Sequence, residues 1–132
     1  MSIDRGTENL FDTYAPDYTT DLLEAESIET LIQTVRSLPA CAIENSWTKG
    51  EYDKAMQEFT FYLLDKLVPG SLPNAVETLT DWTSLDQEYI YGAEAARATL
   101  SGPELWGEIS RLEAECTARF FEHKVRYNAQ QG

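Results

Sequence analysis

The stretch that decides the fold is residues 48–68, TKGEYDKAMQEFTFYLLDKLV. Its first four residues have the capping-box pattern, in which the Thr48 hydroxyl accepts the N–H of Glu51 while the Glu51 carboxylate accepts the N–H of Thr48. Phe61, Leu64 and Val68 lie opposite the main apolar stripe, so this helix must be covered on two sides. The main stripe recurs at helical spacing and consists of Tyr52, Met56, Phe59, Leu63 and Leu67.

The sequence before this stretch predicts another amphipathic helix. Ser27 precedes a segment whose apolar residues fall on one face, and Pro39 is expected to end that helix because proline disrupts a helix interior. Residues 39–47 are then expected to form a loop. Its two large apolar side chains, Ile43 and Trp47, are predicted to plug the core.

The sequence after this stretch contains signals for three further helices. Pro69 and Gly70 end the central helix, and Ser71 is predicted to cap a short one. Capping-box patterns at 84–87 and 101–104 predict helices over about 84–100 and 103–127. We therefore predict an all-α protein, with residues 1–132 as one compact domain of about five helices around the central helix 48–68. Residues 1–26 are expected to form an acidic N-terminal arm or short helices.

The charge balance excludes several classes of partner. Twenty-three acidic residues against ten basic ones give a net charge of −13, which would repel nucleic acid and anionic membranes. The longest apolar runs have four residues, far short of the ~20 that span a bilayer. Without an apolar segment near the N-terminus we expect no secretory signal, and we expect a cytoplasmic protein with reduced Cys41 and Cys116.

Motifs for catalysis and metal binding are not found in the sequence. Gly102 and Gly107 have the glycine spacing of a phosphate-binding loop, but Glu108 stands where that loop requires lysine. His123 is the single histidine, and with Cys41 and Cys116 it cannot supply a tetrahedral zinc site of usual spacing. We expect His123 on the core side of its helix, and we expect no enzyme activity, no catalytic residue, no metal and no cofactor.

Two groups of acidic and aromatic residues are candidate contact surfaces. Residues 1–26 hold seven acidic residues against Arg5 alone, and aromatic residues are interleaved among them. Exposed ion pairs contribute only ~0–1 kcal/mol each, so a charged surface needs such anchors to bind tightly. The first candidate surface consists of Asp12, Tyr14, Asp17, Tyr18, Asp21 and Glu24. The second consists of Glu88, Tyr91 and Glu94.

These features favour a protein that binds and blocks a basic, nucleic-acid-handling protein. Small, acidic, helical proteins of this composition occur in phage and mobile-element counter-defence, as anti-CRISPR or anti-restriction inhibitors, some of them DNA mimics. One alternative is an immunity protein or antitoxin that neutralises a toxin. Another is a structural or adaptor homodimer joined through Trp106, Phe121 and Val125 of the last helix, and the sequence leaves monomer and homodimer open. An enzyme with an unrecognised site is the third class.

Overall fold

The computed structural model describes residues 27–131, and this part of the chain consists of five helices with short connections and no strand. The predicted arm, residues 1–26, lies outside the described residues. The prediction of an all-α, single compact domain is confirmed. The helices are α3 (Ile28–Glu44), α4 (Lys49–Leu67), α5 (Leu72–Leu85), α6 (Gln87–Thr99) and α7 (Gly102–Gln131).

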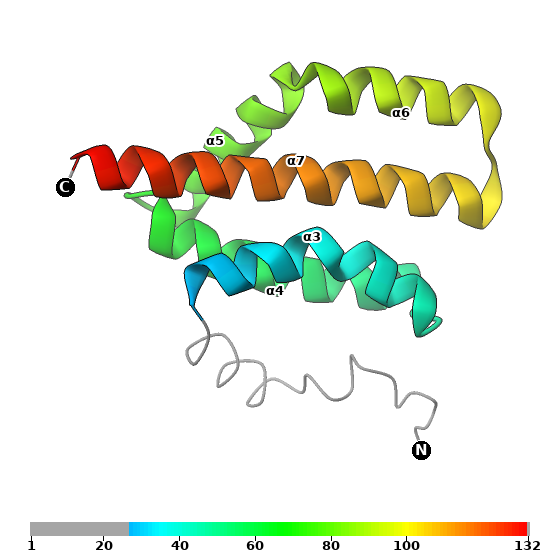
Figure 1. Ribbon diagram of the computed structural model, residues 1–132, viewed down its shortest axis with the longest axis horizontal. Coiled ribbons are helices and arrows are strands. Elements are labelled where there is room, and N and C mark those ends of the chain that lie inside the picture. The colour runs from blue at the N-terminus through cyan, green and yellow to red at the C-terminus, as the bar shows by residue number, and fades with distance from the viewer. Residues whose placement is uncertain (1–26, 132) are drawn as a thin grey trace.

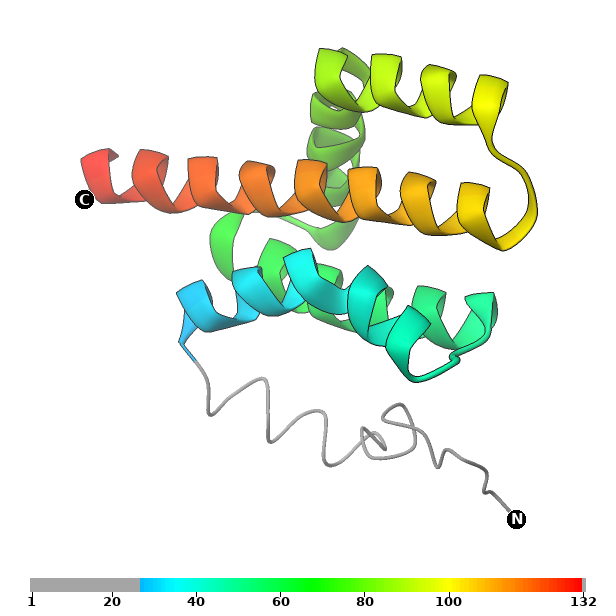
Figure 2. The same ribbon diagram turned by 45° about the vertical axis from the view of Figure 1, so that its right-hand side comes forward.

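The long helix α7 runs through the middle of the structure. Figure 1 shows α6 along one side of α7, and α3 with α4 along the other. In Figure 2, α5 crosses steeply between these two sides and connects α4 to α6. Accordingly α7 packs against all four other helices, whereas α4 packs mainly against α3, α5 and α7.

The stretch 48–68 forms the capped helix predicted for it, although the helix that packs against all four others is α7. The Thr48 hydroxyl accepts the N–H of Glu51 at 3.1 Å, and the Glu51 carboxylate accepts the N–H of Thr48 at 2.8 Å. None of residues 59–64 is exposed, so the second half of α4 is covered on both sides. The far end is held from α7, where the Asn128 side chain donates to the Leu67 carbonyl at 3.0 Å.

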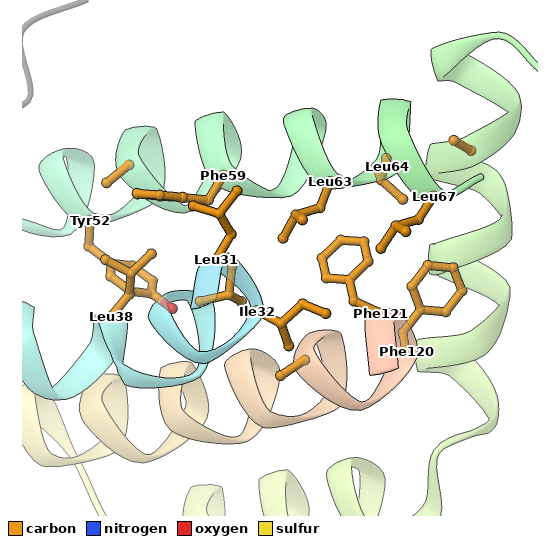
Figure 3. Close-up of a cluster of buried hydrophobic side chains, with 14 of the residues drawn as sticks. Leu31, Ile32, Leu38, Tyr52, Phe59, Leu63, Leu64, Leu67, Phe120 and Phe121 are labelled. Atoms are coloured by element: carbon orange, nitrogen blue, oxygen red, sulfur yellow. The ribbon is translucent and has the colours of Figure 1, made fainter. Parts of the chain in front are cut away.

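The core joins α3, α4 and α7 (Figure 3). From α7, Phe121 points toward α4 and Phe120 toward α5, and they are 0% and 1% exposed. Trp106 and Val125 pack against the same cluster. Of the side chains considered for a homodimer, Phe121 is therefore used in the protein's own core, while Trp106 and Val125 are partly buried against it, and the homodimer stays a prediction.

The expectation that Pro39 ends the first helix is wrong, because α3 continues for five more residues to Glu44. A proline in a helix interior removes one backbone hydrogen bond and crowds the preceding turn. Here Pro39 is itself buried, and the extra turn carries Ala42 into the core, where it is 0% exposed. Burial of these apolar groups compensates for the lost hydrogen bond.

The turn after α3 is a Schellman motif, which places Trp47 in the core. The Trp47 N–H donates to the Ala42 carbonyl at 2.9 Å, and the Ser46 N–H donates to the Ile43 carbonyl at 3.2 Å. Ser46 takes the left-handed position, with φ of 57°. The prediction for Trp47 is confirmed, since it is 6% exposed, but that for Ile43 is wrong. Ile43 still belongs to α3, about 100° around the helix from buried Ala42, and is 56% exposed.

The predicted capping box at 84–87 is also wrong. Ser84 and Leu85 belong to the last turn of α5, and Leu85 is 78% exposed. Asp86 caps α6 instead, and its carboxylate accepts the N–H of Tyr89 at 2.9 Å. Asp86 is both the last cap of α5 and the first cap of α6, so the two helices meet there with no intervening loop. Helix α6 therefore begins two residues later than the capping pattern at Ser84 predicts.

Leu63→Ala should lower the free energy of unfolding by about 2–5 kcal/mol, because it removes a fully buried side chain and leaves a cavity. Asp65→Ala, on the exposed side of the same helix, is the matched control and should stay within about 0.5 kcal/mol. Urea unfolding followed by circular dichroism measures both. Equal midpoints for the two variants would contradict the assigned core.

Ser46→Gly should raise the free energy of unfolding by about 1 kcal/mol. A residue with a Cβ pays roughly that much in the left-handed region, and glycine does not. Ser46→Ala keeps the Cβ and should bring no gain. The denaturation midpoints of the two variants test whether Ser46 occupies the left-handed region. An alanine variant that is more stable than wild type would contradict this conformation.

Candidate protein-binding surface

The second predicted surface lies on the outer side of α6. Glu88, Tyr91 and Glu94 follow one another at intervals of three, which keeps them along one side of the helix. Tyr91 is 63% exposed, Glu94 is exposed, and the Glu88 side chain is 80% exposed. We call these three residues the α6 surface. The six residues of the first predicted surface lie outside the part that the structure describes.

The inner side of α6 explains why these residues face outward. Ala93 and Ala96 on that side are small and are 2% and 4% exposed. At Gly92 an added Cβ would lie 3.0 Å from the Leu112 side chain of α7, so the two helices approach closely here. The opposite side of α6 has no helix of residues 27–131 packed over it, as both overall views show (Figures 1 and 2).

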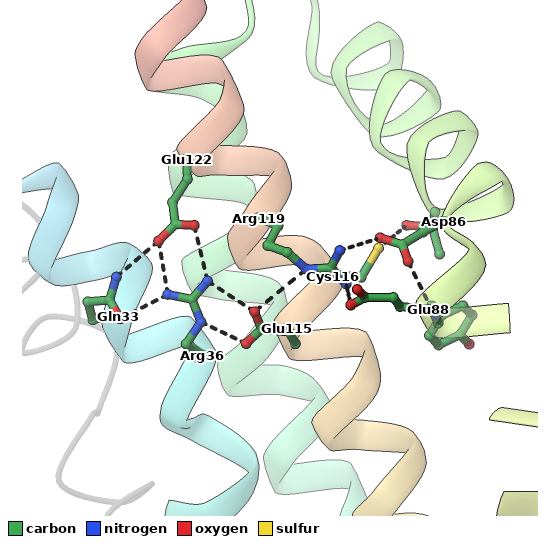
Figure 4. Close-up of polar contacts among 10 residues, drawn as sticks. Gln33, Arg36, Asp86, Glu88, Glu115, Cys116, Arg119 and Glu122 are labelled. Atoms are coloured by element: carbon green, nitrogen blue, oxygen red, sulfur yellow. Dashed lines mark hydrogen bonds and ion pairs between the residues drawn. The ribbon is translucent and has the colours of Figure 1, made fainter. Parts of the chain in front are cut away.

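A line of ion pairs fixes α6 to α7 (Figure 4). Arg119 of α7 lies 3.2 Å from the carboxylate of Asp86 and 3.5 Å from that of Glu88. Its Nε lies 3.6 Å from Glu115, one turn earlier on the same helix. Glu88 of the α6 surface is therefore partly neutralised by Arg119, whereas Tyr91 and Glu94 remain open.

The same line continues from α7 to α3. Arg36 donates to Glu115 at 2.8 Å and to Glu122 at 2.9 Å, and Gln33 also contacts Glu122. These hydrogen bonds, to Glu122 first and to Glu115 second, raise the pKa of Arg36. Sequence reasoning missed Arg36 and Asp86. A partner on a distant helix leaves no local signal in the sequence.

Asp86 is the most enclosed carboxylate of this line, with its side chain 6% exposed. Burial pushes its pKa upward. The N–H of Tyr89, the Cys116 thiol and Arg119 outweigh burial and hold the pKa of Asp86 below its ordinary value. Burial, followed by the neighbouring Asp86, raises the pKa of the Cys116 thiol to about 11. At neutral pH Cys116 is therefore a protonated thiol, which is a weak nucleophile.

Every basic side chain in residues 27–131 has an interaction within the protein. Arg36, Arg111, Arg119 and Lys49 form ion pairs. Lys66 lies over the Tyr62 ring and Lys124 over the Phe120 ring. Arg97 lies near enough to Tyr89 to interact with it electrostatically, and so does Arg126 with Glu122. Lys54 also has an interaction within the protein. Within the same residues several carboxylates have no cation at ion-pair distance, among them Glu29, Asp65, Glu77, Asp81 and Glu94.

Residues 27–131 contain no group of three or more His, Cys, Asp or Glu side chains arranged to hold a metal ion. His123 is exposed and lies against the Trp82 ring at 5.3 Å between centroids, so its predicted place on the core side is wrong. Of the five helices, none has the length and apolar character that crossing a membrane requires.

No family model, no curated protein and no solved structure matches this chain. What the α6 surface and the unpaired carboxylates do must therefore be inferred from their own chemistry.

Asp86→Ala should lower the free energy of unfolding by about 1–3 kcal/mol at neutral pH, because it removes both the helix cap and the partner of Arg119. Asp86→Asn keeps a capping oxygen and should lose less. Since the folded pKa of Asp86 is depressed, its charge stabilises the fold above the ordinary value of 3.8, and this contribution disappears as the pH falls through the folded pKa.

Urea unfolding of wild type and Asp86→Asn, measured from neutral pH down to below the ordinary carboxylate pKa of 3.8, gives the contribution of the Asp86 charge to the free energy of unfolding. The difference between the two should shrink as the solution becomes more acidic. A difference that stays constant with pH would contradict the proposed ionisation of Asp86.

Proposed function

We propose that this protein is a non-catalytic binder that docks on the basic surface of a nucleic-acid-handling protein and blocks it. One observation carries the proposal. Four of the nine basic residues of the described part are held in ion pairs, while many of its carboxylates face solvent with no cation at ion-pair distance. A surface of this kind attracts a basic partner and repels nucleic acid.

The α6 surface offers the aromatic anchor that charge alone lacks. Rim charges mainly accelerate association, and buried aromatic side chains contribute most of the affinity in protein interfaces. Tyr91 is 63% exposed, and the carboxylate of Glu94 on the next turn has no cation of residues 27–131 beside it. Tyr91 would enter the interface, and Glu94 would pair with lysine or arginine of the partner.

The spacing of charges bears on whether the protein mimics DNA. Carboxylates four residues apart on a helix, such as Glu77 and Asp81 of α5, are separated by about 6 Å along the axis. A DNA strand carries a charge about every 3.4 Å. The described helices are therefore sparser in charge than DNA. A DNA mimic would need the seven acidic residues of segment 1–26 as well.

The biological setting we propose is counter-defence in a phage or mobile element, with an anti-CRISPR or anti-restriction type of target. Such targets present lysine- and arginine-lined grooves to nucleic acid, and an acidic protein can occupy them in its place. The acidic excess in segment 1–26 and the α6 surface together supply the charge and the anchor that this role needs.

A capture and displacement experiment tests the proposal. The protein is immobilised and incubated with host lysate at about 0.05 M and about 0.5 M salt, since surface charges are screened as salt rises. The captured protein is then purified and loaded with fluorescent duplex DNA or guide RNA. We expect one equivalent of the acidic protein to displace the nucleic acid, with weaker binding at the higher salt.

Two variants locate the interface. Charge reversal of the first predicted surface changes Asp12, Asp17, Asp21 and Glu24 to lysine. Alteration of the α6 surface combines Tyr91→Ala with Glu94→Lys. Each should weaken capture at least about tenfold, a loss of about 1.4 kcal/mol, with the melting temperature nearly unchanged. Capture of a partner without affinity for nucleic acid, or binding that ignores salt and both variants, would overturn the proposal.

A further inference from the structure

A hollow lies between the end of α3, the α3–α4 turn and the start of α7. It encloses about 790 Å³, which is within the range of sites for small organic ligands. It shares no residue with the α6 surface. Its walls are mainly apolar and include Pro39, Ala40, Ile43, Trp47, Leu100 and Trp106.

The hollow exists because small residues meet there. Ala40 and Ala42 of α3 and Gly107 of α7 line it, and a Cβ added at Gly107 would lie 3.2 Å from the Ile43 side chain. The two helices thus approach closely but leave the space beside this contact empty. Ile43 stands at the mouth with 56% of its surface exposed, so an apolar occupant would cover it.

The two tryptophans that line the hollow are held in place independently of any occupant. Trp47 is fixed by the Schellman turn, whose N–H bond to the Ala42 carbonyl is 2.9 Å long. Trp106 packs edge-on against the Tyr52 ring at 5.6 Å between centroids. A wall fixed before binding costs little ordering entropy when a ligand enters.

The charges at the rim indicate what kind of ligand fits. Lys49 is paired with Asp53 at 3.0 Å, and Arg111 with Glu108 at 2.6 Å. A ligand carboxylate or phosphate would have to displace these internal partners, and it would also meet Glu104. An uncharged ligand disturbs neither pair.

We propose that this hollow binds an uncharged, largely apolar molecule with an aromatic or similarly flat body, stacked against Trp47 and Trp106. The ligand is held by contact with the indole rings and with Ile43. The rim pairs and Glu104 select against anionic molecules. This site is separate from the surface that we assign to a basic protein partner.

Two probes that differ by one charge test the proposal on the full chain. N-phenyl-1-naphthylamine is neutral, and 8-anilinonaphthalene-1-sulfonate is the same aromatic body with a sulfonate. The neutral probe should show an emission increase that saturates at one equivalent, with quenching of tryptophan emission. The sulfonate should bind at least about tenfold more weakly. Non-saturable emission, or tighter binding of the sulfonate, would overturn the proposal.

A filling variant and a matched control locate the probe. Ala40→Trp places a large side chain in the hollow from an exposed position of α3, and should weaken the neutral probe at least about tenfold. Ala95→Trp adds the same side chain at an exposed position of α6 and should leave binding unchanged. Equal affinities for the two variants would contradict the site.

A measurement on the unaltered protein covers the case in which the filling variant does not fold. Of the three tryptophans, Trp82 packs against Phe120 and His123 and does not line the hollow. The indole N–H resonances of Trp47 and Trp106 should shift when the neutral probe is added, and that of Trp82 should not. Shifts at Trp82 alone, or none at all, would exclude this site.

Discussion

The fold depends on the burial of α7 on more than one side. At 1.5 Å per residue its 30 residues extend about 45 Å, and along much of this length side chains on different sides must be covered. Phe120 and Phe121 are neighbours in sequence, so they point about 100° apart, yet both are almost fully buried. The core formed with α3 and α4 covers both, and α5 adds an edge-on contact from Trp82 to Phe120. Toward the start of α7, small residues such as Gly107 and Ala114 let other helices approach instead.

The ion pairs strengthen the contact between α6 and α7, where little apolar surface is buried. The inner side of α6 is made of alanine and glycine, which bring it close to α7 but bury little apolar area. Arg119, held between Asp86 and Glu115, adds a directional contact at the α5–α6 corner. Using arginines in this way also removes positive charge from the surface.

Helix number, fold class and the central stretch could be predicted, because capping patterns and apolar periodicity are local properties. The capping box at Thr48 and the burial of Leu63 and Leu64 follow from spacing alone. The end of α3 and the start of α6 were mispredicted from Pro39 and Ser84, because tertiary contacts, not local sequence, set both helix ends. Burial kept Pro39 within α3, and the ion pair of Asp86 with Arg119 favoured position 86 as the start of α6.

The candidate surfaces were predictable to different degrees. Exposure of Tyr91 and Glu94 follows from their place opposite the alanines of α6. Arg36 could not be found this way, because its partners Glu115 and Glu122 are about 80 residues away in sequence. The hollow at Trp47 and Trp106 was equally inaccessible. It arises from a helix that continues past a proline and from the left-handed turn at Ser46.

The position of α7 in the chain has a consequence for how the protein is made. Its side chains complete the core of α3 and α4, yet α7 is synthesised after all four helices that it joins. On the ribosome, α3 and α4 can form as local helices, but their apolar sides stay uncovered until Phe120 and Phe121 emerge. Cooperative folding must therefore wait for the end of α7. The nascent chain in this interval is the form most exposed to chaperones and to aggregation.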